Sequence, residues 1–201
     1  MRDARGHIIA VAIKLFLQKN YKEVTMKEIV KKTGLSKGAF YHYFDSKESL
    51  FREILDYFSS TFMDIDYERY PQDSLRQFYN HCANEKDTAR ITSPEETAAD
   101  KGSYFNMNFF FLIFDGLKLF PGFREKLENF QNKELRVWTE VINRARERGE
   151  IKSPLNDKLI AMIFIHTGDG IALNLILGGE VRNLKKEIKP VWDKFYESLK
   201  A

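Results

Sequence analysis

Several features that place a chain in a specialised class are scarce or missing in this sequence. One cysteine, Cys82, in 201 residues rules out a disulfide within the chain and predicts a reducing compartment, the cytoplasm. No run of about eighteen uncharged apolar residues is present, which argues against a membrane span. The first residues, MRDARGHIIAVAIKLF, are charged at both ends and lack a small-residue cleavage site, so we expect no signal peptide.

The constellations that mark most enzymes are missing as well. We find no nucleophile paired with a base, no glycine-rich phosphate loop and no complete set of metal ligands. His166 and Asp169 stand three residues apart and could share a metal, but no third ligand lies at a useful spacing, so we favour two hydrogen-bonded interior groups. We therefore predict no enzymatic activity, no cofactor and no metal, and an all-helical enzyme is the least favoured alternative.

Helical periodicity, by contrast, runs along most of the chain, while strand signals are scarce. The apolar face of the first predicted helix shows the three- and four-residue spacing of Ile8, Val11, Ala12, Leu15 and Phe16. We predict an all-α fold of about nine helices in two blocks. Residues 1–46 hold three short helices, residues 47–201 form a larger helical domain, and the fourth helix links the two.

Capping residues set the predicted boundaries. The signals in the first block are a Thr25–Glu28 capping box, Gly34 as C-cap, Ser36 as the third N-cap, and Asp45 or Ser46, with an Asp45–Glu48 box, before the fourth helix. In the second block, long helices are predicted from Pro121 to Gly149, from about Ser153 to Gly178, and from about Leu184 to Leu199 with Pro190 inside.

The short third helix, SKGAFYHYF, suits the major groove of DNA. A helix, a glycine-containing turn and a second short helix form a helix-turn-helix, whose second helix presents its N-terminal residues to base edges. That end is small or flexible here: Ser36, Lys37, Gly38 and Ala39. Gly38 has no side chain to hold the backbone away from the duplex. The anchors at three- and four-residue spacing are Phe40, Tyr43 and Phe44, which we expect to face inward, while Tyr41 and His42 face outward.

The charge distribution supports a polyanionic partner for this block. Residues 1–50 carry ten Lys and Arg against five Asp and Glu, whereas the remainder carries twenty-two against twenty-four. A basic quarter on a near-neutral body favours nucleic acid as the partner of the N-terminal part. Thr25 and Lys47, at the first turns of the second and fourth helices, can offer donors to phosphate oxygens.

At this point the sequence resembles a known family. The segment IIAVAIKLFLQKNYKEVTMKEIVKKTGLSKGAFYHYFDSKESLF, residues 8–51, looks like the N-terminal domain of TetR-type transcriptional regulators, departing at Asn20 and Val30. The resemblance implies DNA contacts, mostly to the backbone, for Thr25, Ser36, Gly38, Tyr41, His42 and Lys47. We add Lys37 and Ala39 as candidates for base-edge contacts.

The resemblance also implies an all-helical body with a ligand cavity and with dimerisation through the last two helices. For the cavity, the predicted lining of an apolar or aromatic ligand is Phe105, Phe109, Phe110, Phe114, Trp138 and His166, with a plain packed core as the competing interpretation. The segments LIAMIFI and IALNLIL favour a homodimer, with Gly168 and Gly170 allowing close helix approach; burial within one chain is the alternative.

These observations together predict a cytoplasmic homodimer that binds double-stranded DNA at a palindromic operator. We predict a repressor that a small apolar or aromatic ligand releases from the operator, through a shift of the linking helix. The alternative is a DNA-binding dimer without a small-molecule sensor.

Overall fold

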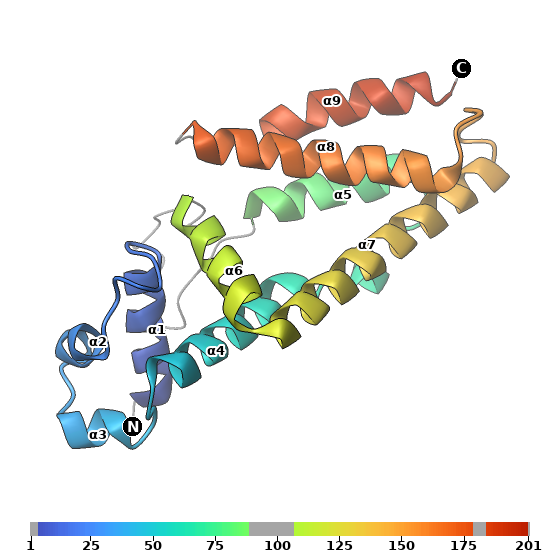
Figure 1. The fold of residues 1–201 in the computed structure, drawn as a ribbon. Coiled ribbons are helices and arrows are strands. Elements are labelled where there is room, and N and C mark those ends of the chain that lie inside the picture. The colour runs from blue at the N-terminus through green and yellow to red at the C-terminus, as the bar shows by residue number, and fades with distance from the viewer. Residues whose placement is uncertain (1–3, 89–106, 179–183, 201) are drawn as a thin grey trace. The chain divides into compact units, whose positions relative to one another are not determined.

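The computed structural model describes residues 4–88, 107–178 and 184–200, and every regular element in these ranges is a helix (Figure 1). The α-helices are α1 (Ala4–Phe16), α2 (Met26–Thr33), α3 (Lys37–Tyr41), α4 (Lys47–Phe58), α5 (Leu75–Thr88), α6 (Met107–Leu119), α7 (Pro121–Glu147), α8 (Asp157–Leu177) and α9 (Leu184–Ser198). A π-helical turn, Ser59–Met63, extends α4, and a 3₁₀ turn, Tyr67–Arg69, precedes α5. The predicted all-α fold of about nine helices is confirmed.

The chain packs into two compact units. The first contains residues 1–63 and 90–127, and the second contains residues 64–89 and 128–201. Helix α7 gives its first turns to the first unit and the rest of its length to the second. These units describe packing, so the predicted functional boundary after residue 46 stays a prediction.

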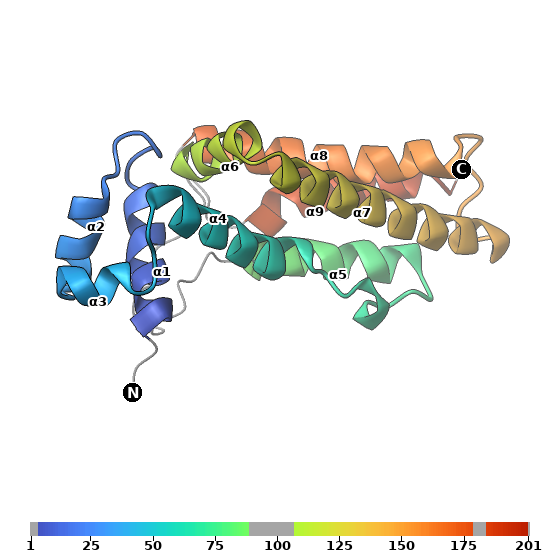
Figure 2. The same ribbon diagram turned by 60° about the horizontal axis from the view of Figure 1, so that its bottom comes forward.

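The first unit is built around the apolar faces of α1 and α4. Helix α1 packs against both α2 and α4 (Figures 1 and 2). Its fully buried side chains include Ile8, Ala12, Phe16, Ile29, Phe40, Leu50, Phe51 and Ile54. A helix of five residues such as α3 is not stable alone, because nucleation costs more than its few hydrogen bonds return. The burial of Phe40 against this core therefore fixes α3 in place.

The predicted caps of α2 and α3 are present, with one correction. Thr25 and Ser36 accept hydrogen bonds from the backbone N–H groups two or three positions into each helix, at 3.2 Å in both cases. Gly34 ends α2 in the left-handed conformation, with φ at 69°. The second half of the predicted box is wrong, because the carboxylate of Glu28 accepts from the Lys19 ammonium at 2.6 Å instead of reaching back to its own N-cap.

Of the two predicted N-caps of α4, Ser46 is the one that the helix uses. The predicted Asp45–Glu48 capping box is wrong, because Ser46 forms the box with Ser49. Asp45 accepts instead from the Ser49 hydroxyl at 2.8 Å. Helix α8 begins after Asn156, whose side chain accepts from a first-turn N–H at 2.8 Å, three residues later than the predicted Ser153.

The second unit has an aromatic core in which a glycine brings α8 and α9 together. The indole of Trp192 packs among Tyr79, Trp138 and Phe164, with ring centroids between 5.5 and 6.2 Å from it. A Cβ on Gly168 would lie 2.8 Å from the Trp192 ring. The close approach predicted at Gly168 is therefore used within one chain, and its assignment to a subunit interface was wrong.

Glu150, just after α7, ties three elements of the second unit together. Its carboxylate accepts from the Ser74 hydroxyl at 2.8 Å, from the backbone N–H groups of Leu75 and Arg76 at 3.0 and 3.2 Å, and from the Tyr196 hydroxyl at 2.8 Å. Partial burial opposes ionisation, but these hydrogen bonds outweigh it and hold the pKa of Glu150 below its usual value. The charge also sits at the N-terminus of α5, where the helix dipole favours it.

Helix α8 is the one described helix with the length and apolar composition of a membrane span. A core helix of a soluble protein meets the same test. About a third of its most apolar window is buried within the chain, and its inner face packs against α9. The leucines on its outer face, Leu159, Leu173 and Leu177, stay exposed within one chain.

Candidate nucleic-acid interface

The N-terminal end of α3 and the residues around it form an exposed surface. Seven of the eight predicted DNA contacts are exposed, namely Thr25, Ser36, Lys37, Gly38, Ala39, Tyr41 and His42. Thr25 and Ser36 accept capping bonds through their hydroxyl oxygens, which leaves each O–H free to donate outward. This surface therefore offers the kind of donors that phosphate oxygens accept.

The inner side of α3 is anchored by two of the three predicted aromatic residues. Phe40 is fully buried, and Phe44 is 3% exposed. Tyr43 was predicted to face inward and is 41% exposed. The prediction failed because α3 ends at Tyr41, so Tyr43 does not continue its helical register. Instead, the Tyr43 ring packs edge-on against His42, with centroids 5.2 Å apart.

Tyr43 is therefore a residue that sequence reasoning missed on the outer surface. Together with Tyr41 and His42 it borders a shallow depression of about 310 Å³, which Arg5 also lines. Arg5 pairs with Glu53 of α4 at 2.8 Å, so its charge is partly neutralised. The shortness of the predicted helix was the feature that could have revealed the exposure of Tyr43. Helical spacing predicts which residues share a face only as far as the helix continues.

Gly38 is exposed on this surface. A Cβ built there would meet no atom of the described chain within 4 Å. Its φ is not positive, so the backbone conformation itself does not require glycine. Lys37, one residue earlier, extends over the Tyr41 ring with its ammonium 5.9 Å from the ring centroid. The fold therefore does not require a glycine at this position, whereas a binding partner that comes close to the backbone would.

Lys47 has a structural role that its sequence position did not reveal. Its ammonium donates to the backbone carbonyls of Tyr21 and Val24 at 2.8 and 2.9 Å and lies 4.3 Å from the Tyr21 ring centroid. It thereby fixes the α1–α2 loop against the start of α4. An ammonium has three protons, so one remains for a phosphate oxygen.

Tyr21 connects the same loop to α6. Its hydroxyl donates to Glu48 at 3.0 Å, and its backbone N–H donates to the carboxylate of Asp115 in α6 at 3.2 Å. Burial, and then the hydrogen bond to Glu48, raise the pKa of Tyr21, so the hydroxyl stays protonated at ordinary pH. The α1–α2 loop is therefore held from α4 and from α6 at once.

The basic character of the N-terminal block is concentrated on exposed lysines of α2 and α3. Lys27, Lys31 and Lys32 on α2 and Lys37 on α3 are all exposed. In the described part of the chain no carboxylate pairs with any of the four, whereas Lys19 is neutralised by Glu28. Uncompensated lysines beside the recognition helix favour a polyanion.

The six predicted ligand residues are described only in part, and the described ones belong to both compact units. Phe105 lies outside the described residues, as does the side chain of Phe109. Phe110 is half-buried and Phe114 is 60% exposed in the first unit. In the second unit Trp138 is fully packed in the core and His166 is exposed. The predicted pocket stays a prediction. His166 and Asp169 are both exposed, so their assignment as interior groups was wrong.

The second unit also buries polar groups that sequence reasoning did not select. Tyr67, Cys82 and Glu134 are between 4% and 7% exposed. The Tyr67 hydroxyl has no hydrogen-bond partner within the described residues, and burial followed by the nearby charge of Glu134 raises the pKa of this tyrosine. No spacing in the sequence relates these three residues, because the fold alone brings them together.

Comparison with known proteins supports this description. Residues 8–54 match the model of the family described as bacterial regulatory proteins, tetR family. The chain is 42% identical over 80 residues to the uncharacterized HTH-type transcriptional regulator YuxN of Bacillus subtilis, covering 39% of this chain and 28% of that protein. It is 29% identical over 124 residues to the HTH-type transcriptional repressor NemR of Escherichia coli, covering 50% and 62%. The matches thus span less than two thirds of these relatives.

The fold extends the likeness along the whole chain. The structure of a TetR transcription regulator from Haloarcula marismortui superposes with a TM-score of 0.71 at 14% identity, covering 99% of both chains. Reduced NemR of E. coli superposes with a TM-score of 0.63 at 17% identity, covering 96% of this chain and 97% of that one. The match over residues 8–54 shows that the N-terminal part of the chain is a domain of the tetR family of bacterial regulatory proteins, and the superpositions show that the fold of the whole chain is that of TetR regulators.

Proposed function

We propose that this protein is a cytoplasmic, homodimeric transcriptional regulator that binds a palindromic operator through α3 and its flanking residues. The observation that carries the proposal is the exposed N-terminal end of α3, held rigidly by the buried Phe40 and Phe44 beside four uncompensated lysines. A helix in the major groove must be fixed from behind and open in front, and α3 meets both conditions.

The contacts divide by chemistry. The hydroxyl, imidazole and ammonium groups of Thr25, Ser36, Tyr41, His42 and Lys47 suit phosphate oxygens. Gly38 allows the backbone to approach the duplex. Lys37 and Ala39 are our candidates for base edges, since a lysine can donate to guanine and a methyl group can contact thymine. To these we add Tyr43, whose hydroxyl lies on the same exposed surface as His42.

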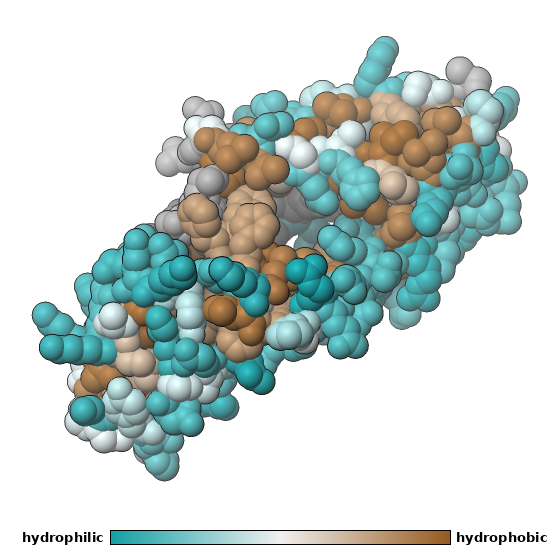
Figure 3. Space-filling view, in the orientation of Figure 1, coloured by the Kyte–Doolittle hydropathy of each residue, from teal (hydrophilic) through white to brown (hydrophobic). Residues whose placement is uncertain are grey.

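A homodimer is favoured by the outer face of α8. Leu159, Leu173 and Leu177 are 39%, 41% and 57% exposed and recur at helical spacing with His166 and Gly170. A Cβ on Gly170 would meet nothing within 4 Å, so a second helix could approach there. Val191 on α9 is also 44% exposed. Figure 3 shows hydrophobic side chains gathered over the α8 and α9 part of the visible face.

We propose control by a small apolar or aromatic ligand because one hydrogen bond connects α6 to the α1–α2 loop. One relative supports repression as the mode of regulation. Asp115 links α6 directly to the α1–α2 loop, so a shift of α6 would reach the DNA-contacting block. NemR of E. coli is an HTH-type transcriptional repressor, and we propose repression here too. A DNA-binding dimer without a sensor is the second candidate, because Trp138 is fully packed in an aromatic core, as the plain-core interpretation expects.

The DNA proposal is tested by changing the outward-facing pair. Tyr41→Ala combined with His42→Ala should weaken binding to every DNA sequence and reduce the dependence of affinity on salt, because backbone contacts carry no sequence information. The operator is first selected from a random duplex library with the purified protein. Fluorescence anisotropy at several salt concentrations then gives the affinity and its salt slope for both proteins.

Two single variants sharpen this test. Lys37→Ala should alter sequence preference by about 1–3 kcal/mol at one position if Lys37 contacts a base. Lys158→Ala, an exposed cation at the start of α8, should leave affinity and salt slope unchanged. Failure to select any sequence, or a double variant with unaltered binding, would contradict the proposed interface.

The dimer proposal is tested at Leu173. Leu173→Asp places a charge in the exposed apolar stripe of α8 and should convert the dimer to a monomer, because a desolvated unpaired charge costs several kcal/mol. The adjacent exposed Asn174→Asp adds the same charge off the stripe and serves as its control. Light scattering coupled to size-exclusion chromatography measures the mass. A wild-type monomer at micromolar concentration, or a dimeric Leu173→Asp, refutes the assignment of α8.

A further inference from the structure

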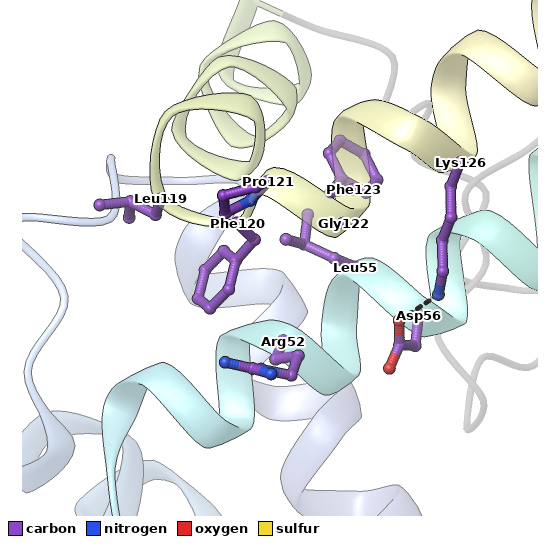
Figure 4. Close-up of a pocket in the computed structure, with 9 residues that line it drawn as sticks. All are labelled: Arg52, Leu55, Asp56, Leu119, Phe120, Pro121, Gly122, Phe123 and Lys126. Carbon is purple, nitrogen blue, oxygen red and sulfur yellow. Dashed lines mark hydrogen bonds and ion pairs between the residues drawn. The ribbon is translucent and has the colours of Figure 1, made fainter.

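A pocket of about 340 Å³ opens where α4 meets the end of α6 and the start of α7 (Figure 4). Its walls come from Arg52, Leu55 and Asp56 of α4 and from residues 119–123 and Lys126. The three segments belong to the first compact unit. Helices α4 and α6 approach closely beneath the pocket, since a Cβ on Gly116 of α6 would lie 2.8 Å from the side chain of Leu55 of α4. The volume is within the range of small-molecule sites, about 300–1,000 Å³.

The interior of this pocket is apolar. Leu55 and Phe123 are buried beneath it, Phe120 is half-buried, and Leu119 is 42% exposed at the rim. In Figure 4 the side chains of Leu55 and Phe123 lie between Arg52 and the Lys126–Asp56 pair, and the Phe120 ring lies beside Arg52. The interior therefore suits a flat hydrocarbon group, which would bury apolar area against these side chains.

One end of the pocket holds an arginine without a carboxylate partner in the described chain. The guanidinium of Arg52 lies 5.2 Å from the Phe120 ring centroid, in a cation–π contact. The neighbouring acids on α4 are engaged elsewhere, since Glu48 accepts from Tyr21 and Glu53 pairs with Arg5. A stacked guanidinium keeps its in-plane donors available, and these match a carboxylate in pairs.

The other end carries a cation that is only partly neutralised. Lys126 pairs with Asp56 at 2.6 Å, but both side chains are about half exposed, at 49% and 56%. An exposed pair of this kind is worth only about 0–1 kcal/mol and exchanges partners easily. The pocket thus has two cations against one carboxylate. It favours a single negative charge and disfavours a cationic ligand.

We propose that this pocket binds a small aromatic monocarboxylate, with its carboxylate on Arg52 and its ring against Phe120 and Leu55. The proposal follows from the juxtaposition of an unpaired guanidinium, an apolar interior and a volume that admits one or two fused rings. The binding site stands independently of the DNA-binding proposal. Only its regulatory consequence, a change in operator affinity through α4, rests on that proposal.

The test uses 2-naphthoate as the probe and the full chain without DNA. Isothermal titration calorimetry should show saturable binding of one 2-naphthoate per chain, and the neutral 2-naphthamide should bind much more weakly. Arg52→Gln should weaken binding about tenfold, the usual size of a lost charged hydrogen bond. Asp56→Asn should tighten binding about threefold, because it removes a competing carboxylate and frees Lys126.

Matched controls use exposed cations close to the pocket that do not line it. Lys118→Gln and Arg124→Gln remove one charge each and should leave the affinity for 2-naphthoate unchanged. Circular dichroism confirms that each variant is folded. No saturable binding to the wild type, full binding by Arg52→Gln, or equal loss in Arg124→Gln each overturns the site.

A second measurement separates ligand binding in the pocket from its proposed effect on operator affinity. Adding 2-naphthoate to the protein on its selected operator should lower the affinity for DNA, and the Arg52→Gln variant should not respond. Binding of the probe with unchanged operator affinity would leave the site standing and refute its coupling to DNA. Absence of any operator, with naphthoate binding intact, would instead count against the DNA-binding proposal alone.

Discussion

Replacing Gly38 with leucine should weaken operator binding by a factor of roughly ten to a hundred while leaving the fold at least as stable as the wild type. Gly38 lies in α3 with helical φ, and a Cβ there meets no atom within 4 Å, so the chain accepts the side chain without strain. Leucine also favours helix over glycine by about 0.8–1 kcal/mol. Operator affinity should therefore fall while the free energy of unfolding rises. A folding defect would lower both.

The loss of binding would come from the duplex side. In the proposed complex the backbone at Gly38 approaches the DNA directly, and a leucine there would occupy space that the DNA needs. Overpacking of a closely fitted contact costs about 1–3 kcal/mol, or roughly tenfold to a hundredfold in affinity. Anisotropy with the selected operator measures the affinity, and urea denaturation measures the free energy of unfolding.

A matched glycine provides the control for this result. Gly122 in α7 is exposed, helical and equally free of neighbours within 4 Å. Gly122→Leu should therefore raise stability similarly and leave operator binding unchanged when measured without 2-naphthoate, since Gly122 lines the proposed ligand pocket. Gly38→Ala should fall between wild type and Gly38→Leu. Normal operator binding by Gly38→Leu would show that the N-terminal end of α3 does not enter the groove.

Local signals in the sequence predicted the caps of α2 and α3 well. Thr25, Gly34 and Ser36 act within three or four residues of themselves, so their roles follow from sequence neighbours alone. Tyr43 marks where this logic ends. Its inward position was predicted from helical spacing, but α3 ends at Tyr41, before that spacing reaches Tyr43. The neighbouring sequence does not indicate where so short a helix ends.

The interactions that the sequence did not reveal connect residues far apart in the chain. Lys47 was assigned to phosphate alone because nothing near it indicates the carbonyls of Tyr21 and Val24, more than twenty residues earlier. Gly168 was assigned to a subunit interface because the sequence does not show that Trp192 occupies the space beside it. Periodicity shows that a face is buried or approached closely, but not which partner covers it.

Removing the carboxylate of Glu150 should be among the most destabilising single changes in the second unit. Glu150→Ala leaves the Tyr196 hydroxyl and the first N–H groups of α5 without their acceptor. Hydrogen bonds to a charged group are worth about 1.5–3 kcal/mol each and are not additive, so we expect a loss of about 2–4 kcal/mol. Glu147→Ala, at an exposed position nearby, should change stability by less than about 0.5 kcal/mol.

The pH dependence of stability identifies the charge as the cause. The folded-state pKa of Glu150 lies below its usual 4.5, so its contribution is fully present above that pH and is lost as the pH falls through the folded pKa. Urea denaturation from pH 7 to pH 3 should therefore show the wild type and Glu150→Gln converging at the acid end. A difference that stays constant at every pH would contradict the role of the charge, because a protonated glutamate is neutral like glutamine and differs from it only slightly in shape.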